Sequence, residues 1–139
     1  MGEIRILQFA IGGEKYGIPL ERVQQVVPVP EIMPLPEVPE FVAGITNVRG
    51  EILLVIDPAA KLNRGRTQIT QKCKLIITSS DEGKFAILCE DMPDVVSEAE
   101  ENITQDLSSY DLKIDPEFVD AVAPERFLVI LKPEKLVEV

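Results

Sequence analysis

The amino-acid sequence predicts an all-β fold: two small barrels of five strands each, related by an internal repeat, packed around a shared core and accompanied by short helical turns. Three observations lead to this prediction. Valine, isoleucine and leucine dominate short apolar runs, and β-branched residues favour strands. Glycine and proline separate those runs, as turn residues do. Finally, the runs occur twice in the same order along 139 residues. Because either half alone would be a marginal domain, the halves are expected to pack together.

The repeat covers most of the chain. Residues 6–27 align without a gap with residues 75–96, "FVAGI" at 41–45 aligns with "FVDAV" at 118–122, and "ILLVIDP" at 52–58 aligns with "FLVILKP" at 127–133. The shared order and spacing make chance similarity the weaker explanation. The sequence therefore predicts a single domain, residues 1–139, with one subdomain over about residues 15–72 and another over about residues 73–139. The N-terminal strand is a candidate for exchange between them.

Each unit is expected to contain the same elements. The first unit has predicted strands at 4–11, 15–18 and from Val26, a helical turn after Pro19, a hairpin at 41–57 and a helical turn at 58–62. The second unit repeats them at 74–79, 85–90, 95–96, 118–132 and from Pro133. Five prolines in the connector at 28–39 argue against a strand. This connector is expected to pack down through Ile32, Met33, Leu35 and Val38. The acidic connector at 97–116 is expected to be more exposed.

The composition argues against several classes of function. A formal net charge of −10 repels nucleic acid and anionic lipid surfaces. The chain contains no histidine, which removes Ser-His and Cys-His nucleophile pairs and histidine-liganded metals. It has no phosphate-binding loop and no calcium-loop spacing. Asp57, before Pro58, is expected to cap a helical turn rather than to catalyse. We therefore expect no enzyme activity, no cofactor, no metal site and no nucleic-acid partner.

The cysteines and the N-terminal segment indicate the compartment. The segment "MGEIRILQF" lacks the basic and apolar regions of a signal peptide, and no apolar run is long enough to span a bilayer. Cys73 and Cys89 lie singly in apolar runs, which suits buried free thiols in a reducing compartment. The expectation is a cytoplasmic protein without membrane insertion.

The turn inside "GITNVRGEILLVID", residues 44–57, carries unusual residues. Asn47 suits the first position of a type I turn and Gly50 the fourth, which makes Val48 and Arg49 the central pair and places both at the tip. The matching turn of the second unit, "APER", is expected to be two residues shorter. A loop that varies on a shared scaffold is where binding specificity tends to lie, so Arg49 beside apolar groups predicts a contact site. A solvated arginine in an ordinary turn is the alternative.

Four segments resemble the CheW family of bacterial chemotaxis coupling proteins. "FVAGITNVRGEILLVID" resembles the family's F-[IV]-x-G-[IV]-x-N-L-R-G-x-[IV]-[IL]-P-[IV]-[IV]-[DN]-L segment, and "QFAIGGEKYGIPLERVQQVV" resembles its opening segment. "FAILCEDMPDVV" and "VILKPEKL" resemble a later segment and the closing segment. The chain differs from the family pattern at Val48 (usually leucine), Pro58 (usually leucine), Ala86 and Ala121 (usually glycine) and Cys89 (usually valine).

The resemblance implies two SH3-like five-stranded barrels and a non-enzymatic adaptor. Such proteins join the cytoplasmic tip of chemoreceptors (methyl-accepting chemotaxis proteins) to a CheA-type histidine kinase, whose regulatory domain has the same fold. The resemblance therefore implies recruitment to membrane-associated receptor arrays. Carried over by position, receptor contact falls on Val23, Gly44 and Arg49. We extend this candidate site to the neighbours Asn47 and Val48.

Two other functions stay open. One is a small-molecule-binding barrel, or an enzyme that uses a cavity between the barrels, which needs convergent polar groups in an apolar pocket. The other is a detached kinase-regulatory domain of a related receptor–kinase pathway. A ligand-dependent thermal shift distinguishes the first from an adaptor, and a kinase pulldown bears on the second.

Overall fold

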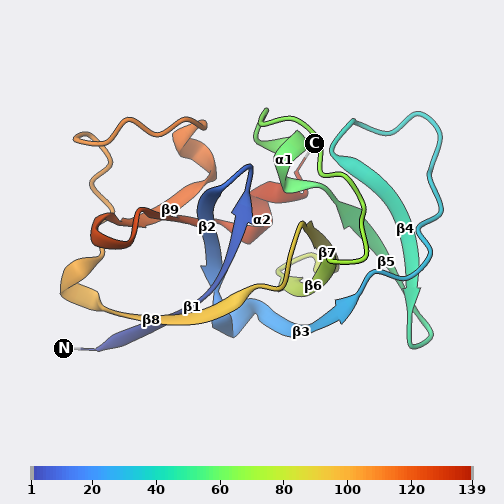
Figure 1. Cartoon of the computed structure of the whole chain (residues 1–139), viewed down its shortest axis with the longest axis horizontal. Helices are drawn as coiled ribbons and strands as arrows, with labels where there is room; N and C mark the ends of the chain where they lie inside the picture. The colour runs from blue at the N-terminus through green and yellow to red at the C-terminus, as the bar shows by residue number, and fades with distance from the viewer. Residues whose placement is uncertain (1, 139) are drawn as a thin grey trace.

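The structure, a computed structural model, describes residues 2–138 and consists mainly of short strands (Figure 1). The strands are β1 (Glu3–Ile11), β2 (Glu14–Pro19), β3 (Val23–Pro28), β4 (Val42–Val48), β5 (Glu51–Ile56), β6 (Lys74–Ser80), β7 (Gly83–Cys89), β8 (Asp94–Ala99), β9 (Val119–Ala123) and β10 (Leu128–Leu131). The α-helices are α1 (Pro58–Lys61) and α2 (Pro133–Leu136). Single 3₁₀ turns lie at Leu20–Arg22, Glu100–Asn102, Pro116–Phe118 and Pro124–Arg126.

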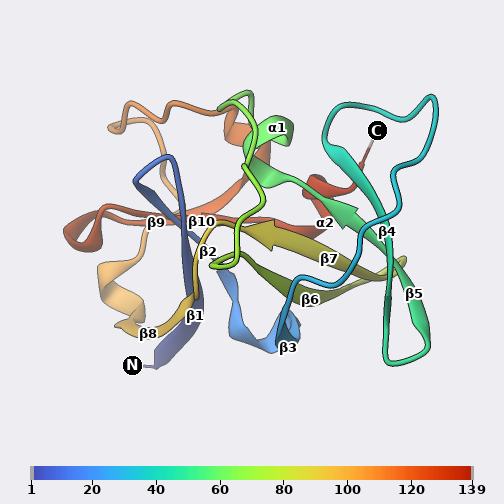
Figure 2. The ribbon, with the colours of Figure 1, turned by 45° about the vertical axis from the view of Figure 1, so that its right-hand side comes forward.

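The ten strands form two five-stranded sheets, which lie side by side along the long axis of the molecule (Figures 1 and 2). Barrel A has the strand order β8-β1-β2-β10-β9, and barrel B has the order β3-β6-β7-β5-β4. Most neighbours are antiparallel, but β10 runs parallel to β2 and β5 runs parallel to β7. The predicted all-β fold of two five-stranded barrels is confirmed.

The expected division of the chain near residue 72 does not match the barrels. Barrel A takes β1 and β2 from the first repeat unit and β8, β9 and β10 from the second, whereas barrel B takes β3, β4 and β5 from the first unit and β6 and β7 from the second. The exchange therefore involves a whole hairpin in each direction, not the N-terminal strand alone. In barrel A, the parallel pair β2–β10 joins the hairpin β1–β2 to a strand of the second unit. In barrel B, the parallel pair β5–β7 joins the hairpin β6–β7 to a strand of the first unit.

Each barrel is closed by the connector that follows one of its edge strands. After β3, Met33 pairs with Ile45 of β4 through two hydrogen bonds of 2.8 and 2.9 Å. After β8, Thr104 pairs in the same way with Val122 of β9, through two bonds of 2.9 Å. Such pairing protects backbone groups that an edge strand would otherwise expose.

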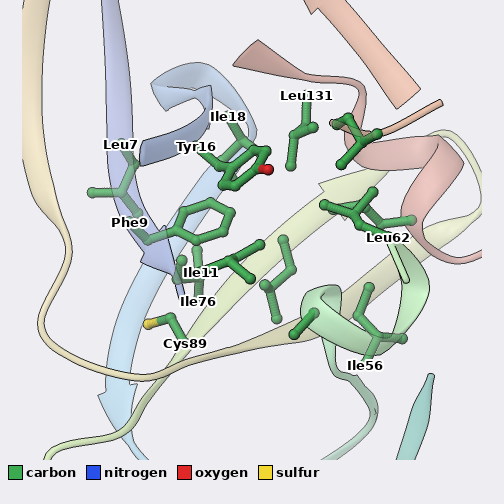
Figure 3. Close-up of a cluster of buried hydrophobic side chains, with 14 of the residues drawn as sticks. Leu7, Phe9, Ile11, Tyr16, Ile18, Ile56, Leu62, Ile76, Cys89 and Leu131 are labelled. Atoms are coloured by element: carbon green, nitrogen blue, oxygen red, sulfur yellow. The ribbon is translucent and has the colours of Figure 1, made fainter. Parts of the chain in front are cut away.

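Three apolar clusters stabilise this arrangement. One fills barrel A with side chains from β1, β9 and β10, and another fills barrel B with side chains from β4 to β7. The third and largest lies between the barrels and takes Leu7, Phe9 and Ile11 from β1 (Figure 3). Because successive strand residues face opposite sides, β1 contributes Ile6 to the interior of barrel A and its odd-numbered neighbours to the shared core.

The helical turns also follow the repeat. Asp57 precedes Pro58 and caps α1, as predicted, by accepting a hydrogen bond from the Ala59 amide (3.1 Å). Leu62 after α1 and Leu136 in α2 both enter the shared core. Cys73 and Cys89 are free and buried, as expected.

Candidate functional site

The β4–β5 hairpin turns through Arg49 and Gly50, not through Val48 and Arg49 as predicted. Val48 pairs with Glu51 across the hairpin, which leaves a two-residue loop. Arg49 has φ +52° and Gly50 has φ +88°. Two positive φ angles are the mark of a type I′ turn, whose twist suits a tight hairpin. The side chain of Asn47 fixes this turn, because its Oδ1 accepts a hydrogen bond from the Gly50 amide at 2.7 Å.

The prediction that Val48 projects from the tip is wrong. Val48 is the last residue of β4 and lies 8% exposed in the interior cluster of barrel B. Gly44, Thr46 and Val48 occupy alternate, buried positions of β4, whereas Asn47 is exposed. Val48 therefore lies buried at the base of the turn. Of the two residues predicted to form the centre of the turn, Arg49 alone is exposed.

Gly44 lies where the connector crosses β4. Its φ is +148°, and a Cβ atom built on it would lie 2.2 Å from the Met33 carbonyl oxygen. No side chain fits at that distance. The glycine of the "AGI" sequence thus permits the Met33–Ile45 pairing that closes barrel B.

Val23 lies on the other edge of the same sheet. It begins β3, pairs with Thr78 of β6 at a register shift, and packs half-buried against the shared core. Since the strand order of barrel B is β3-β6-β7-β5-β4, three strands separate Val23 from Gly44 and Arg49 within the sheet. The structure places Gly44, Asn47 and Arg49 on one hairpin, and it places Val23 on the edge strand whose connector closes the barrel against that hairpin through Met33 and Ile45.

An apolar groove beside the hairpin was not predicted. We define the hairpin groove as the depression of about 360 Å³ lined by Glu31, Met33, Ile45, Thr46, Asn47 and Ile52. Met33 is 63% exposed and Ile52 is 61% exposed. The expectation that Met33 packs down is thus wrong, although Ile32 does pack against the interior of barrel B. Alternation could have identified the exposure of Ile52, because it lies directly before buried Leu53 on β5.

Arg49 is exposed in the turn that follows Asn47, one of the residues that line this groove. Among residues 2–138 it forms no salt bridge, while Lys84 and Glu51 pair nearby at 3.3 Å. The same hairpin carries Ile52, which is also exposed, and arginine is among the residues on which protein interfaces concentrate their binding energy. The arrangement suits protein recognition rather than covalent chemistry.

The corresponding hairpin of the second unit has a different end. The hairpin as a whole, β9 to β10, contains fewer residues than β4 to β5. Its loop, between paired Ala123 and Leu128, is nevertheless longer and contains the 3₁₀ turn Pro124–Arg126. The prediction of a shorter turn was therefore wrong for the loop itself. Phe127 follows at φ +54° and is 84% exposed. The two hairpins consequently present different side chains, an arginine and a phenylalanine.

Within residues 2–138, no three His, Cys, Asp or Glu side chains come together in a way that would hold a metal ion. None of the helices in that part of the chain is long and apolar enough to cross a membrane. The carboxylate of Asp57 is engaged in structural hydrogen bonds. Besides the Ala59 amide, its two oxygens accept hydrogen bonds from the amide and the hydroxyl of Thr67.

Comparisons with known proteins agree with the fold. The crystal structure of the scaffolding protein TtCheW from Thermoanaerobacter tengcongensis superposes with a TM-score of 0.88 and 28% identity, covering 100% of this chain and 90% of that one. This match confirms the expected pair of SH3-like barrels. The chemotaxis protein CheW of Klebsiella aerogenes is 26% identical over 132 residues, which are 94% of this chain and 79% of that protein.

Two further observations identify the family. The chemotaxis protein CheW of Treponema pallidum is 24% identical over 140 aligned positions, covering 96% of this chain and 82% of that protein. The sequence pattern that defines the CheW-like domain matches residues 5–139, nearly the entire chain. The resemblance noted in the hairpin thus extends over both barrels, and the chain belongs to the CheW-like domain family.

Proposed function

We propose that this protein is a non-enzymatic adaptor of a chemotaxis signalling complex, which couples the cytoplasmic tip of a chemoreceptor to a CheA-type histidine kinase. The observation that carries the proposal is the hairpin of barrel B, which has an exposed Arg49 in its turn and an apolar groove along its strands, in a chain that matches the CheW-like domain over residues 5–139. The names of the relatives, chemotaxis protein CheW and scaffolding protein, support the same function.

In this proposal the receptor contacts barrel B. Arg49 supplies the exposed charge, and Asn47 holds the turn that directs it. Gly44 contributes shape, because it keeps the Met33 backbone close to β4. Val48 acts from inside the barrel rather than as a contact. Val23, on the edge strand that precedes the Met33 connector, supplies a second part of the contact surface.

A second partner is needed for coupling. We assign it to the regulatory domain of a CheA-type kinase, and we place the complex in the cytoplasm at membrane-associated receptor arrays. Two weak contacts made together bind far more tightly than either alone, because the first raises the effective concentration for the second. The acidic surface, with a net charge of −10, suits protein partners better than nucleic acid.

The test measures binding to each partner separately and to both together. A purified receptor cytoplasmic fragment and a CheA-type kinase are each immobilised, and the variants Arg49→Ala, Val23→Ala and their double mutant are compared with the unaltered protein. Arg49→Ala is expected to weaken receptor binding by about tenfold. Kinase binding and the unfolding curve should stay unchanged for this variant.

Arg66→Ala is the matched control. Arg66 is also an exposed arginine, with its side chain 69% exposed, and its surface pair with Glu40 contributes little stability. If Arg49→Ala, Val23→Ala and the double mutant all bind the receptor fragment as the unaltered protein does, the receptor surface proposed here is wrong. If the unaltered protein binds neither partner, the adaptor function is wrong.

A further inference from the structure

Phe127, in the loop of the β9–β10 hairpin, is the most exposed large apolar side chain among residues 2–138, at 84%. Its φ of +54° and ψ of +40° lie in the left-handed region, which a residue with a Cβ atom adopts at a cost in energy. A single exposed apolar side chain is ordinary. A strained backbone that also holds a large aromatic ring in water is typical of a position kept for binding.

The loop that carries Phe127 is fixed by hydrogen bonds on its other side. Arg126 donates from Nε to the Glu98 carboxylate of β8 at 2.6 Å and from Nη2 to the Ser97 carbonyl at 3.1 Å. The Phe127 amide donates to the Pro124 carbonyl, also at 3.1 Å. The loop lies at the end of barrel A that faces away from barrel B (Figures 1 and 2). Because this backbone is already held, a contact made through Phe127 loses little conformational freedom on binding.

Phe127 also lines a depression of about 300 Å³, which we call the Phe127 depression. Leu112 and Val129 line it as well and are partly exposed, so its apolar surface can be reached from solvent. Tyr16 and Ile114 complete the apolar lining and are buried. An exposed aromatic ring and an apolar depression thus lie side by side on the same surface.

The charged residues around the Phe127 depression balance one another. Glu14 and Lys113 line it and pair at 3.6 Å. Lys15 and Asp111 line it too, are exposed, and form no salt bridge with any of residues 2–138. The four charges sum to zero on a chain with a net charge of −10, so two copies repel one another least at this surface. A twofold rotation also brings Lys15 of one copy to Asp111 of the other, which makes the surface complementary to itself.

From the strained, exposed Phe127 and this balance of charge, we infer that this end of barrel A is the interface of a homodimer. Two copies pack about a twofold axis, and the Phe127 ring of each enters the depression of the other. Lys15 of each copy pairs with Asp111 of the second copy, so the ion pair occurs twice. The surface is small, and we expect a reversible dimer with a Kd on the order of 100 μM. The dimer does not depend on the adaptor function, whose proposed receptor contact belongs to barrel B.

Sedimentation equilibrium of the full-length protein, from about 10 μM to about 1 mM, measures the dimer. Phe127→Ser is expected to weaken dimerisation at least about tenfold, because it removes the aromatic anchor. Met92→Ser is the matched control: Met92 is 59% exposed between β7 and β8, and its loss should leave the dimer unchanged. Thermal unfolding checks that both variants are folded. An unaltered protein that stays monomeric over the whole range, or a Phe127→Ser protein that dimerises as tightly as the unaltered one, would overturn the inference.

Two exchanges of charge test how the copies face one another. Lys15→Glu brings carboxylates together at both ion pairs, and Asp111→Lys brings ammonium groups together, so each variant alone should dimerise at least about tenfold more weakly. In an equimolar mixture of the two variants, both contacts again join opposite charges. The mixture should therefore form a heterodimer about as tight as the unaltered homodimer. The twofold arrangement is rejected if either variant alone dimerises like the unaltered protein, or if the mixture stays monomeric.

Discussion

Gly44 and Met33 approach so closely that a methyl group does not fit between them. The two residues belong to β4 and to the proline-rich connector, and a Cβ on Gly44 would lie 2.2 Å from the Met33 carbonyl oxygen. The connector hydrogen-bonds β4 at the next residue, Ile45. The closure of barrel B therefore depends on a residue that the family resemblance assigns to receptor contact.

Gly44→Ala is predicted to destabilise the protein by about 3 kcal/mol, because the methyl group meets backbone and the φ of +148° disfavours any side chain. Chemical denaturation measures the change. Gly50→Ala is the control: its φ of +88° is also unfavourable, but nothing lies within 4 Å of the added atom. That variant is expected to lose only about 1 kcal/mol. Equal losses for both variants would contradict the role of the close approach.

The exchange of hairpins predicts the behaviour of the separated halves. Fragments 1–72 and 73–139 each contain only part of both barrels. Neither is expected to fold as a monomer, whereas an equimolar mixture should regain the β-sheet circular dichroism and the dispersed amide spectrum of the intact chain. A fragment that folds alone as a monomer would show that one half encodes a complete barrel.

Asp57 is predicted to contribute more to the free energy of unfolding than an ordinary helix cap does. Its carboxylate, 6% exposed as a residue, accepts hydrogen bonds from the Ala59 amide and from the amide and hydroxyl of Thr67. Asp57→Ala leaves the buried Ala59 amide and the two half-buried Thr67 donors without this partner and should cost about 2–3 kcal/mol in chemical denaturation. Thr67→Val removes one donor and should cost less. The prediction fails if Asp57→Ala unfolds at the same denaturant concentration as the unaltered protein.

Glu98 gives the stability of barrel A a dependence on pH. A hydrogen bond from the Asn102 side chain, and then one from Arg126, hold the pKa of the Glu98 carboxyl below its ordinary value of 4.5. A carboxyl whose pKa is lower in the folded than in the unfolded state stabilises the fold at pH values above its unfolded-state pKa. That stabilisation is lost as the pH falls through the folded-state pKa. Between about pH 6 and about pH 3, Glu98→Gln should therefore lose less stability than the unaltered protein.

Glu101→Gln is the control for this comparison, because Glu101 is exposed in the same segment and forms no ion pair within the described residues 2–138. Its stability should fall with pH as steeply as that of the unaltered protein. The assignment to Glu98 is rejected if Glu98→Gln and Glu101→Gln have the same pH profile.

The cysteines are predicted to resist modification in the folded protein. Burial raises the pKa of the Cys89 thiol from its ordinary 9.0 to about 11, and Cys73 is also buried. Because the thiolate is the reactive form, iodoacetamide at about pH 8 should label neither residue quickly. Both should react after denaturation. Intact mass measurement follows the labelling, and rapid uptake of one label by the native protein would contradict the buried position of that cysteine.

Local pattern predicted most of the elements. The alternation of β1, the prolines that start the helical turns at 20–22, 58–61 and 133–136, and the Asp57 cap all depend on neighbouring residues, so they could be identified in the sequence. The pairing of β2 with β10 and of β5 with β7 could not, because strand partners far apart in the chain leave no local signal. The repeat indicated two similar units without indicating that they share strands.

The hairpin shows where a local rule fails. Asn47 and Gly50 fit the ends of a type I turn, but the pair of positive φ angles lies one residue later, at Arg49 and Gly50. Arginine is not a residue that favours positive φ, so composition gave no hint of a type I′ turn. Continued alternation along Gly44, Thr46 and Val48 was the signal that could have shown Val48 to be buried.

The reciprocal exchange of hairpins has a consequence for how such a molecule can arise. Two copies of a chain carrying one repeat unit can build both barrels, each lending its first hairpin to the other, as a domain-swapped homodimer with a twofold axis between the barrels. Joining the copies end to end through the segment after α1 makes the same exchange intramolecular, so folding no longer depends on protein concentration. Fusion also frees the two hairpin tips to diverge. One tip now carries Arg49 and the other Phe127, a difference that a symmetric dimer of identical chains cannot have.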